Sequence, residues 1–134
     1  MNILLLDDNP HRITFFKNGL KTHKLTICSH ARAAMKILKK TSFDVIFLDH
    51  DLQEGRIDPE DANTGSEVAG FIADQEIACP CIVLHTENDI GRAAMEAILD
   101  QCHSIPYGKL KKLGFHTVLK MVHQGEAAQD SNED

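Results

Sequence analysis

Three short apolar runs in this sequence each end in polar residues that can bind a cation or move a proton. In the run FDVIFLDHDL, the apolar stretch stops at Leu48 and two carboxylates follow around a histidine. The three polar ends are Asp7 and Asp8; Asp49, His50 and Asp51; and His85, Thr86, Glu87, Asn88 and Asp89. Carboxylate oxygens suit Mg²⁺ or Mn²⁺, and imidazole titrates near neutral pH. These residue types predict metal-assisted or acid–base chemistry.

The spacing of apolar residues predicts that strands and helices alternate along the chain. We expect strands over residues 2–6, 24–28, 44–48, 81–85 and 103–106. We expect helices over 11–21, from Ser29 or His30 to about 38, over 65–75, after an N-cap at Asp89, and over 109–123, with Gly125 ending the last. The run before Asp49 is apolar on both faces, which is typical of a central strand in a parallel sheet.

Five such units predict an α/β fold in which helices cover both faces of a parallel sheet. The simplest arrangement is a flavodoxin-like, three-layer α/β/α sandwich with strand order 2-1-3-4-5. We expect one domain over residues 1–124 and an acidic, disordered tail over 125–134. The carboxyl ends of parallel strands share one edge of the sheet, so the three polar ends should meet in space.

Carboxylates gathered at that edge require compensation. Two like charges ~4 Å apart repel by roughly 4 kcal/mol at an effective dielectric near 20. Either some of the acids are protonated or a divalent cation binds, with Asp7, Asp8, Asp49 and Asp51 as candidate ligands. Oxygen ligands favour Mg²⁺ or Mn²⁺, and ligation by the histidines would favour a transition metal.

Taken one at a time, these residues have plainer explanations. An acidic pair after a strand often forms a turn or a helix cap, and Thr86, Asn88 and Asp89 could simply cap the next helix. His50 could be a surface histidine and His85 a hydrogen-bonded, half-buried one. The convergence of three strand ends is what favours a cation site.

Composition excludes several classes of partner. The formal net charge is -6, and no basic stripe lies outside the last helix, so a DNA duplex is not expected as a partner. No apolar run is long enough to cross a membrane. The run after Met1 is too short for a signal peptide, so we expect a cytoplasmic protein with reduced cysteines.

The polar strand ends make the sequence similar to response-regulator receiver domains over about residues 1–123. The resemblance rests on LLLDD, FDVIFLD and IVLHT. It implies a CheY-like fold, with Asp7 and Asp8 as Mg²⁺ ligands. It also implies Asp49 as metal ligand and phosphoacceptor, and Thr86 as the hydroxyl that senses the phosphoryl group. The lysine of that family is missing, because Ile105 precedes Pro106 and Lys109 comes three residues late.

A narrower family resembles the sequence more closely, namely the cyclic-phosphate-processing receiver domains. The resemblance rests on LDHDL, on Thr64 and Gly65, and on HTENDIGRAAM, which contains His85, Asn88, Gly91 and Met95. It implies metal-dependent handling of a cyclic phosphodiester. The catalytic residues expected under this hypothesis are His50, His85 and Asp49, and the substrate-binding residues are Thr86, Asn88, Gly91 and Arg92, with Arg92 forking onto a phosphate. Met95 is expected to be core.

Three functions remain open at this stage. The first is a phosphoesterase acting on a cyclic nucleotide or on a 2′,3′-cyclic phosphate at an RNA end. The second is a stand-alone receiver that a histidine kinase phosphorylates at Asp49. The third is a module that binds a nucleotide or a partner protein without catalysis, in which the long loop over residues 53–63 acts as a lid or an interface.

Overall fold

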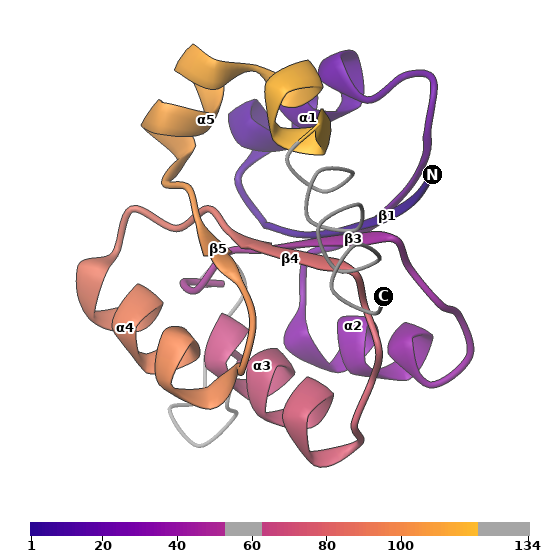
Figure 1. Ribbon diagram of the computed structural model, residues 1–134, viewed down its shortest axis with the longest axis vertical. Helices are drawn as coiled ribbons and strands as arrows, with labels where there is room; N and C mark the ends of the chain where they lie inside the picture. The colour runs from indigo at the N-terminus through magenta and orange to yellow at the C-terminus, as the bar shows by residue number, and fades with distance from the viewer. Residues whose placement is uncertain (53–62, 121–134) are drawn as a thin grey trace, which may run out of the picture.

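Strands and helices alternate strictly along the chain, as the apolar spacing predicts. The computed structural model describes residues 1–52 and 63–120 (Figure 1). In chain order the elements are β1 (Asn2–Leu6), α1 (Pro10–Gly19), β2 (Lys24–Cys28), α2 (Ala31–Leu38), β3 (Val45–Leu48), α3 (Gly65–Asp74), β4 (Cys81–Leu84), α4 (Asp89–Ile98), β5 (His103–Ser104) and α5 (Tyr107–Leu113). The acidic tail over 125–134 and most of the predicted loop lie outside the described residues.

The five strands form one parallel sheet in the order β2-β1-β3-β4-β5, which confirms the predicted topology. In the register, Leu6 pairs with Leu48, and Leu48 pairs with Leu84. The last residues of β1, β3 and β4 therefore lie side by side. The backbone pairing continues one step further, since the N–H of Asp49 donates to the Leu6 carbonyl and the N–H of His85 to the Leu48 carbonyl.

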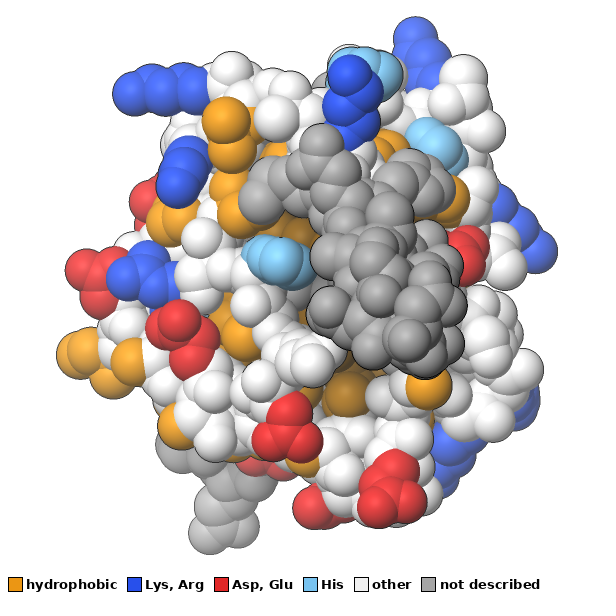
Figure 2. All heavy atoms as spheres, viewed as in Figure 1, with side chains coloured by type: hydrophobic (Ala, Val, Ile, Leu, Met, Phe, Trp, Pro, Cys, Tyr) orange, Lys and Arg blue, Asp and Glu red, His pale blue; other side chains and the backbone are white. Residues whose placement is uncertain are grey.

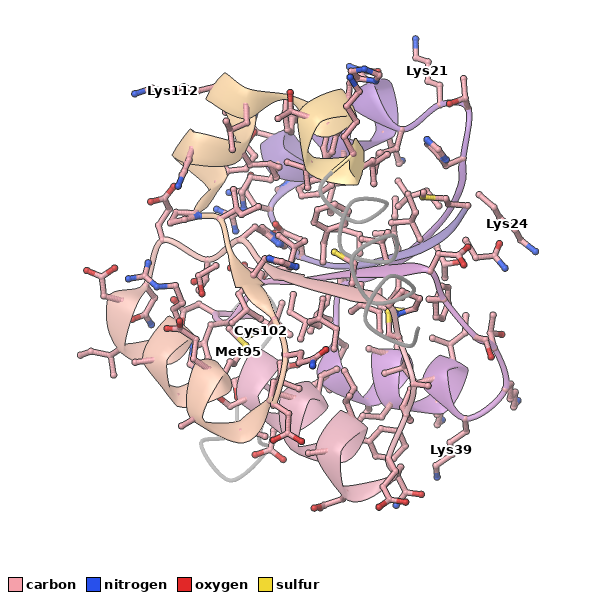
Figure 3. The ribbon with its side chains drawn as sticks, in the orientation of Figure 1. Lys21, Lys24, Lys39, Met95, Cys102 and Lys112 are labelled. Atoms are coloured by element: carbon pink, nitrogen blue, oxygen red, sulfur yellow. The ribbon has the colours of Figure 1, made fainter. Side chains whose placement is uncertain are left out.

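Helices cover both faces of the sheet. Figure 1 shows α1 and α5 on one side and α2, α3 and α4 on the other. Leu5, Phe47 and Val83 pack into the core with α1 and α5. Leu6, Leu48 and Leu84 pack into the core on the opposite side, with Met95 of α4 among their neighbours. Met95 is fully buried between α4 and the sheet, as expected (Figure 3).

Strand alternation decides which face each polar end residue takes. Successive side chains of a strand point to opposite faces. The residues after Leu6, Leu48 and Leu84 therefore continue the set that faces α1 and α5. These three residues are Asp7, Asp49 and His85. The next residue after Asp49 is His50, and by the same alternation it turns toward α3 and α4.

Two helices differ from the sequence-based expectation at their ends. Helix α1 begins at Pro10, one residue early, because the Asn9 side chain accepts from the backbone N–H groups of His11 and Arg12. Asn88 rather than Asp89 is the N-cap of α4. An asparagine carbonyl accepts the orphan N–H groups of a helix start as readily as a carboxylate.

The buried face of helix α4 includes a glycine. Gly91 and Met95 are buried, whereas Ile90 is 84% exposed. The burial of Met95 agrees with its expected place in the core.

The long final helix expected over 109–123 is interrupted. Helix α5 ends at Leu113, and Gly114 takes a φ of 79°, a left-handed conformation that favours glycine. Residues 115–120 are helical again, and the remainder of the expected helix lies outside the described residues. Leu113, the last residue of α5, is 37% exposed, while Leu110 on the same helix is fully buried.

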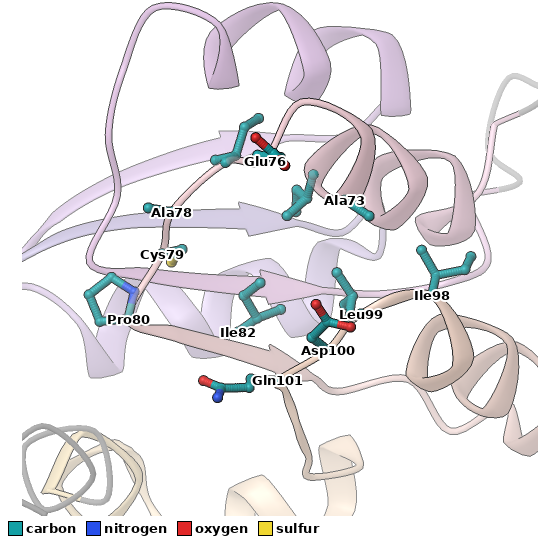
Figure 4. A pocket seen from close by; sticks show the side chains of 12 residues that line it. Ala73, Glu76, Ala78, Cys79, Pro80, Ile82, Ile98, Leu99, Asp100 and Gln101 are labelled. Atoms are coloured by element: carbon teal, nitrogen blue, oxygen red, sulfur yellow. The ribbon is translucent and has the colours of Figure 1, made fainter. Parts of the chain in front are cut away.

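A groove opens at the far end of the sheet, between the end of α3 and the connection from α4 to β5 (Figure 4). Its lining includes Ile77, Pro80, Leu99 and Gln101. Pro80 precedes β4, so the groove lies at the amino end of that strand. The polar strand ends are at the opposite edge and take no part in it.

The surface carries its charges unevenly. On the face in Figure 2, most acidic side chains lie over the α3 and α4 half. Helix α5 carries Lys109, Lys111 and Lys112, all exposed, and Lys112 points into solvent in Figure 3. None of the four cysteines, all of which are described, forms a disulfide. Among the described helices, none has the length and apolarity needed to cross a bilayer.

Candidate functional site

Three carboxylates meet at the carboxyl ends of β1 and β3. Asp7, Asp8 and Asp49 each offer an oxygen, and these oxygens all lie within 4.8 Å of one another. Asp7 is fully buried and Asp49 is 4% exposed. Three acidic oxygens at this spacing match the hard, oxygen-only ligand set that Mg²⁺ and Mn²⁺ prefer. The described residues therefore fit a divalent cation at the place the sequence predicts.

Arg12 reaches into this cluster from the first turn of α1. Its Nε donates to Asp7 at 2.8 Å, and its Nη2 donates to Asp7 and to Asp49 at 3.0 Å each. Arg12 was not among the candidate site residues, because protonation and a bound cation were the only two expected sources of charge compensation. One signal was available: the helix dipole disfavours a cation in the first turn, so an arginine there implies an anionic partner nearby.

Both oxygens of Asp7 are saturated with donors. The Oδ1 atom accepts from the Asn9 backbone N–H at 2.9 Å and from Arg12, and the Oδ2 atom accepts from Arg12 and from His85 Nε2 at 2.8 Å. Burial by itself would raise the pKa of Asp7, but the hydrogen bonds from His85 and Arg12 outweigh it and lower that pKa to about 2. Asp7 is therefore a stable, buried anion.

Asp49 has a less favourable environment for its charge. Burial raises the pKa of Asp49, and the charge of Asp7 acts in the same direction. His85 and Arg12 oppose this shift without cancelling it. The two buried acids of the cluster are thus unequal, since the protein stabilises the anion of Asp7 and destabilises that of Asp49.

His85 is enclosed and serves Asp7. Its side chain is fully buried, and its ring lies 5.1 Å from that of Phe16 and 6.4 Å from that of Phe47, centroid to centroid. The Nε2 atom is bonded to Asp7, and Nδ1 has no hydrogen-bond partner among the described residues. With its one engaged nitrogen on the Asp7 carboxylate and no exposed surface, His85 orients Asp7.

His50 lies on the other face of the sheet and is held at both ring nitrogens. Nδ1 pairs with Asp51 at 3.0 Å, and Nε2 lies 3.1 Å from the Ser66 hydroxyl at the start of α3. The ring packs against Gly91, where an added Cβ would come within 2.8 Å of Cδ2. The side chain keeps 16% exposure. A carboxylate bonded to one nitrogen fixes the tautomer of an imidazole, so Asp51 sets which nitrogen of His50 faces Ser66.

Asp51 lies outside the carboxylate cluster found among the described residues. The sequence analysis included it among the metal ligands, but its carboxylate contacts His50, and both of its oxygens lie 3.2 Å from Asn88 Nδ2. The side chain of Asp51 lies on the α3 and α4 side, where it contacts His50 and Asn88. Its position suits orientation of His50.

The residues expected to bind substrate are engaged within the protein. Asn88 Oδ1 accepts from the N–H groups of Ile90 and Gly91 at 3.1 Å, and these bonds cap the start of α4. Thr86 is 2% exposed, and its hydroxyl accepts from the Asn88 N–H at 3.1 Å. Thr86, Asn88 and Gly91 thus fix the position of His50 and Asp51.

Among the residues predicted to bind substrate, Arg92 is the one whose side chain is held only by exposed ion pairs. Its guanidinium pairs with Asp89 at 2.9 Å and approaches Glu96 at 3.9 Å, and both acids are largely exposed. Exposed ion pairs contribute little free energy. An incoming phosphate can therefore draw Arg92 away from them.

A comparison of the sequence with known protein families found a match. A family model described as the cyclic-phosphate processing receiver domain matches residues 2–101. No curated protein matches the sequence.

Solved structures share the fold at low identity. Response regulator TrrA from Thermotoga maritima, in complex with Mg²⁺ and beryllofluoride, is 21% identical with a TM-score of 0.66, covering 91% of this chain and 99% of that one. A sensor histidine kinase receiver domain from Pseudomonas aeruginosa, with magnesium in its active-site cleft, is 17% identical with a TM-score of 0.64, covering 91% and 93%. A CheY-like receiver from Methanospirillum hungatei is 14% identical with a TM-score of 0.68, covering 94% and 96%.

Proposed function

Because the chain belongs to the cyclic-phosphate processing receiver domain family, we propose that it is a divalent-cation-dependent phosphoesterase that opens a cyclic phosphate. The substrate is a cyclic nucleotide or a 2′,3′-cyclic phosphate at an RNA end. The water oxygen forms a bond to phosphorus while one ester P–O bond of the ring breaks. The proton of the water passes to a base, and the departing alkoxide takes up a proton, giving a phosphomonoester.

The carboxylates of β1 and β3 hold the cation in this proposal. Asp7, Asp8 and Asp49 provide the ligand oxygens, and His85 keeps Asp7 in place through its buried hydrogen bond. A bound Mg²⁺ or Mn²⁺ supplies charge stabilisation to the phosphate oxygens. Arg92 adds a phosphate contact from α4.

His50 is the proton-transfer residue, and its position is the observation that carries the proposal. It directly follows Asp49 of the carboxylate cluster, is held by Asp51 and Gly91, and keeps part of its ring exposed. His85, the other predicted base, has no exposed surface with which to reach a substrate. A receiver that works only as a phosphorylation switch has no need of an oriented histidine directly after its strand-end aspartate.

The test is turnover of cyclic phosphates by the purified protein with Mn²⁺ or Mg²⁺. The panel comprises 3′,5′- and 2′,3′-cyclic nucleotides, cyclic oligonucleotides and RNA with 2′,3′-cyclic ends. We expect a phosphomonoester product, and we expect His50→Asn to lower kcat by about 10²–10⁴, the usual contribution of a positioned acid or base. Metal affinity should stay the same, because His50 lies outside the carboxylate cluster.

His116→Asn is the matched control, since His116 is exposed on the far helical segment and should retain full turnover. Absence of turnover with every substrate and both metals would refute the proposed function. Full turnover by His50→Asn would refute the assignment of His50.

Ser66 blocks the outer nitrogen of His50, which leads to a second prediction. The side chains of Ser66, His50 and Asp51 are connected in the same order as a serine hydrolase triad. We nevertheless expect the Ser66 hydroxyl to occupy the position that the attacking water molecule takes when substrate is bound. Ser66→Ala should therefore keep turnover within about threefold, since it removes no group that transfers a proton. A hundredfold loss, or covalent labelling of Ser66 by a fluorophosphonate, would identify Ser66 as a nucleophile instead.

Phosphorylation of Asp49 by a histidine kinase is the second candidate function, favoured by the three-acid cluster itself. Against it stand Ile105, which is buried in the core where receivers carry a lysine, and Thr86, whose hydroxyl is already engaged. Incubation with acetyl phosphate and Mg²⁺ distinguishes the two functions. Intact-mass spectra should show no phosphorylated protein, and stoichiometric phosphorylation lost in Asp49→Asn would favour the switch.

A further inference from the structure

Arg12 is the only described cation that contacts both buried acids of the cluster, and it comes from an unexpected element. Its guanidinium bridges Asp7 and Asp49, and the Arg12 side chain as a whole is 25% exposed. In the position where the receiver resemblance implies a lysine, β5 is followed by Ile105, which packs into the core. The positive charge at Asp49 is therefore supplied by α1.

Metal binding and the observed position of Arg12 compete for the same oxygens. A carboxylate has about four lone-pair positions, and those of Asp7 are filled by Asn9, His85 and two contacts with Arg12. The Asn9 donor is a backbone N–H, and His85 is wholly buried, so neither can withdraw easily. Arg12 is the donor that can leave, because its side chain is long and partly exposed.

A second contact shows where the displaced guanidinium can go. Arg12 Cζ lies 5.9 Å from the centre of the Tyr107 ring, and Lys111 Nζ lies 5.4 Å from the same centre. An aromatic face within this range attracts a cation. Tyr107 follows β5, at the same edge of the sheet as the acids. Arg12 can therefore leave the acids and remain at the mouth of the site.

From these contacts we propose that Arg12 is an exchangeable cation, which holds Asp7 and Asp49 without metal and binds the phosphate of the ligand once a divalent cation has displaced it. This inference rests on the proposed function for its ligand class. A planar guanidinium forks onto two phosphate oxygens, so Arg12 supplies the charge that the lysine supplies in the resembling family. The positive charges of metal and arginine then flank one phosphate.

The test uses the opposite effects that this exchange imposes on cation and anion binding. Arg12→Gln removes a competitor, so the affinity for Mn²⁺ alone, measured by electron paramagnetic resonance, should rise at least about tenfold. With Mg²⁺ saturating, the affinity for inorganic phosphate, measured by calorimetry, should fall by about tenfold or more. Arg12→Lys keeps the positive charge but cannot form two parallel hydrogen bonds to a phosphate. Its affinity for Mn²⁺ should be close to that of the wild type, and its affinity for phosphate should be lower.

Lys17→Gln is the matched control, because it removes the same charge from an exposed position of α1 and should leave both affinities unchanged. Circular dichroism confirms that each variant is folded. Weaker or unchanged Mn²⁺ binding in Arg12→Gln would overturn the proposal, as would unchanged phosphate binding. Failure of wild type and Arg12→Gln alike to bind Mn²⁺ would also overturn it. Opposite shifts without any turnover of cyclic phosphates would refute the proposed function and leave the exchange of Arg12 standing.

Discussion

Asp7→Asn should destabilise the metal-free protein by about 3 kcal/mol or more, whereas Asp49→Asn should stabilise it. Asp7 is fully buried and its oxygens accept from Asn9, Arg12 and His85. An amide at position 7 presents N–H groups to some of these donors and removes the charged partner of Arg12. The substitution is costly because the wholly buried His85 loses the carboxylate that accepts its hydrogen bond.

The opposite sign at Asp49 follows from its different environment. Burial and the nearby charge of Asp7 raise the pKa of Asp49, so the folded protein disfavours its anion. An asparagine there has no charge to bury and still offers a carbonyl oxygen to Arg12. Both substitutions should abolish tight binding of divalent cations, since each removes one of three ligand carboxylates.

Urea unfolding in the presence of EDTA measures both effects without contribution from metal. Asp74→Asn, at an exposed position in the last turn of α3, is the control and should change the free energy of unfolding by less than about 0.5 kcal/mol. Destabilisation by Asp49→Asn as large as that by Asp7→Asn would contradict the assigned inequality of the two acids.

Gly91→Ala should remove most of the proposed activity while leaving the metal ligands intact. The new Cβ would overlap the His50 ring, which lies against Gly91. The ring has to move, and its hydrogen bonds with Asp51 and Ser66 move with it. We expect kcat to fall at least about tenfold, because even a small displacement of a catalytic group lowers the reaction rate strongly. Overpacking should cost about 1–3 kcal/mol of stability despite the better helix propensity of alanine.

Gly70→Ala is the matched control for this substitution. Gly70 lies within α3, and a Cβ there meets no atom within 4 Å. That variant should be more stable by about 0.5–1 kcal/mol and fully active, because alanine favours a helix. We would measure steady-state kinetics, Mn²⁺ affinity and thermal unfolding for both variants. The comparison distinguishes the effect of displacing His50 from the effect of alanine on helix stability. Unimpaired turnover by Gly91→Ala would show that the His50 position is not required.

The inequality of the two histidines changes how the site is understood. In the sequence, His50 and His85 look equivalent, since each lies at the end of an apolar run and each precedes polar residues. In the fold, His85 is bonded to the buried Asp7 carboxylate from within the core, whereas His50 is partly exposed on the opposite face of the sheet. The acidic cluster is thus accompanied by one buried histidine and one partly exposed histidine, and only the second has exposed surface.

The sequence by itself determined the sheet and the edge at which the site forms. Strand and helix periods differ, so apolar spacing revealed the alternation, and right-handed crossovers left the order 2-1-3-4-5 as the simplest one. Because parallel strands share their carboxyl edge, the meeting of Asp7, Asp8 and Asp49 followed from topology alone. These features depend on local periodicity and on chain connectivity, and both are contained in the linear order of the residues.

Only the tertiary structure decided which polar side chains compensate one another. The pairing of Arg12 with Asp7 and Asp49 joins α1 to two strand ends, and its sequence separation gives no local signal beyond an unfavourable charge in a first helical turn. Tertiary packing also decided three other features: the cap of α4 at Asn88, the position of Asp51 beside His50, and the contact of the His50 ring with Gly91. Hydrogen bonds and charge pairs act over a few ångströms and in particular directions, so they are set by how the helices pack on the sheet.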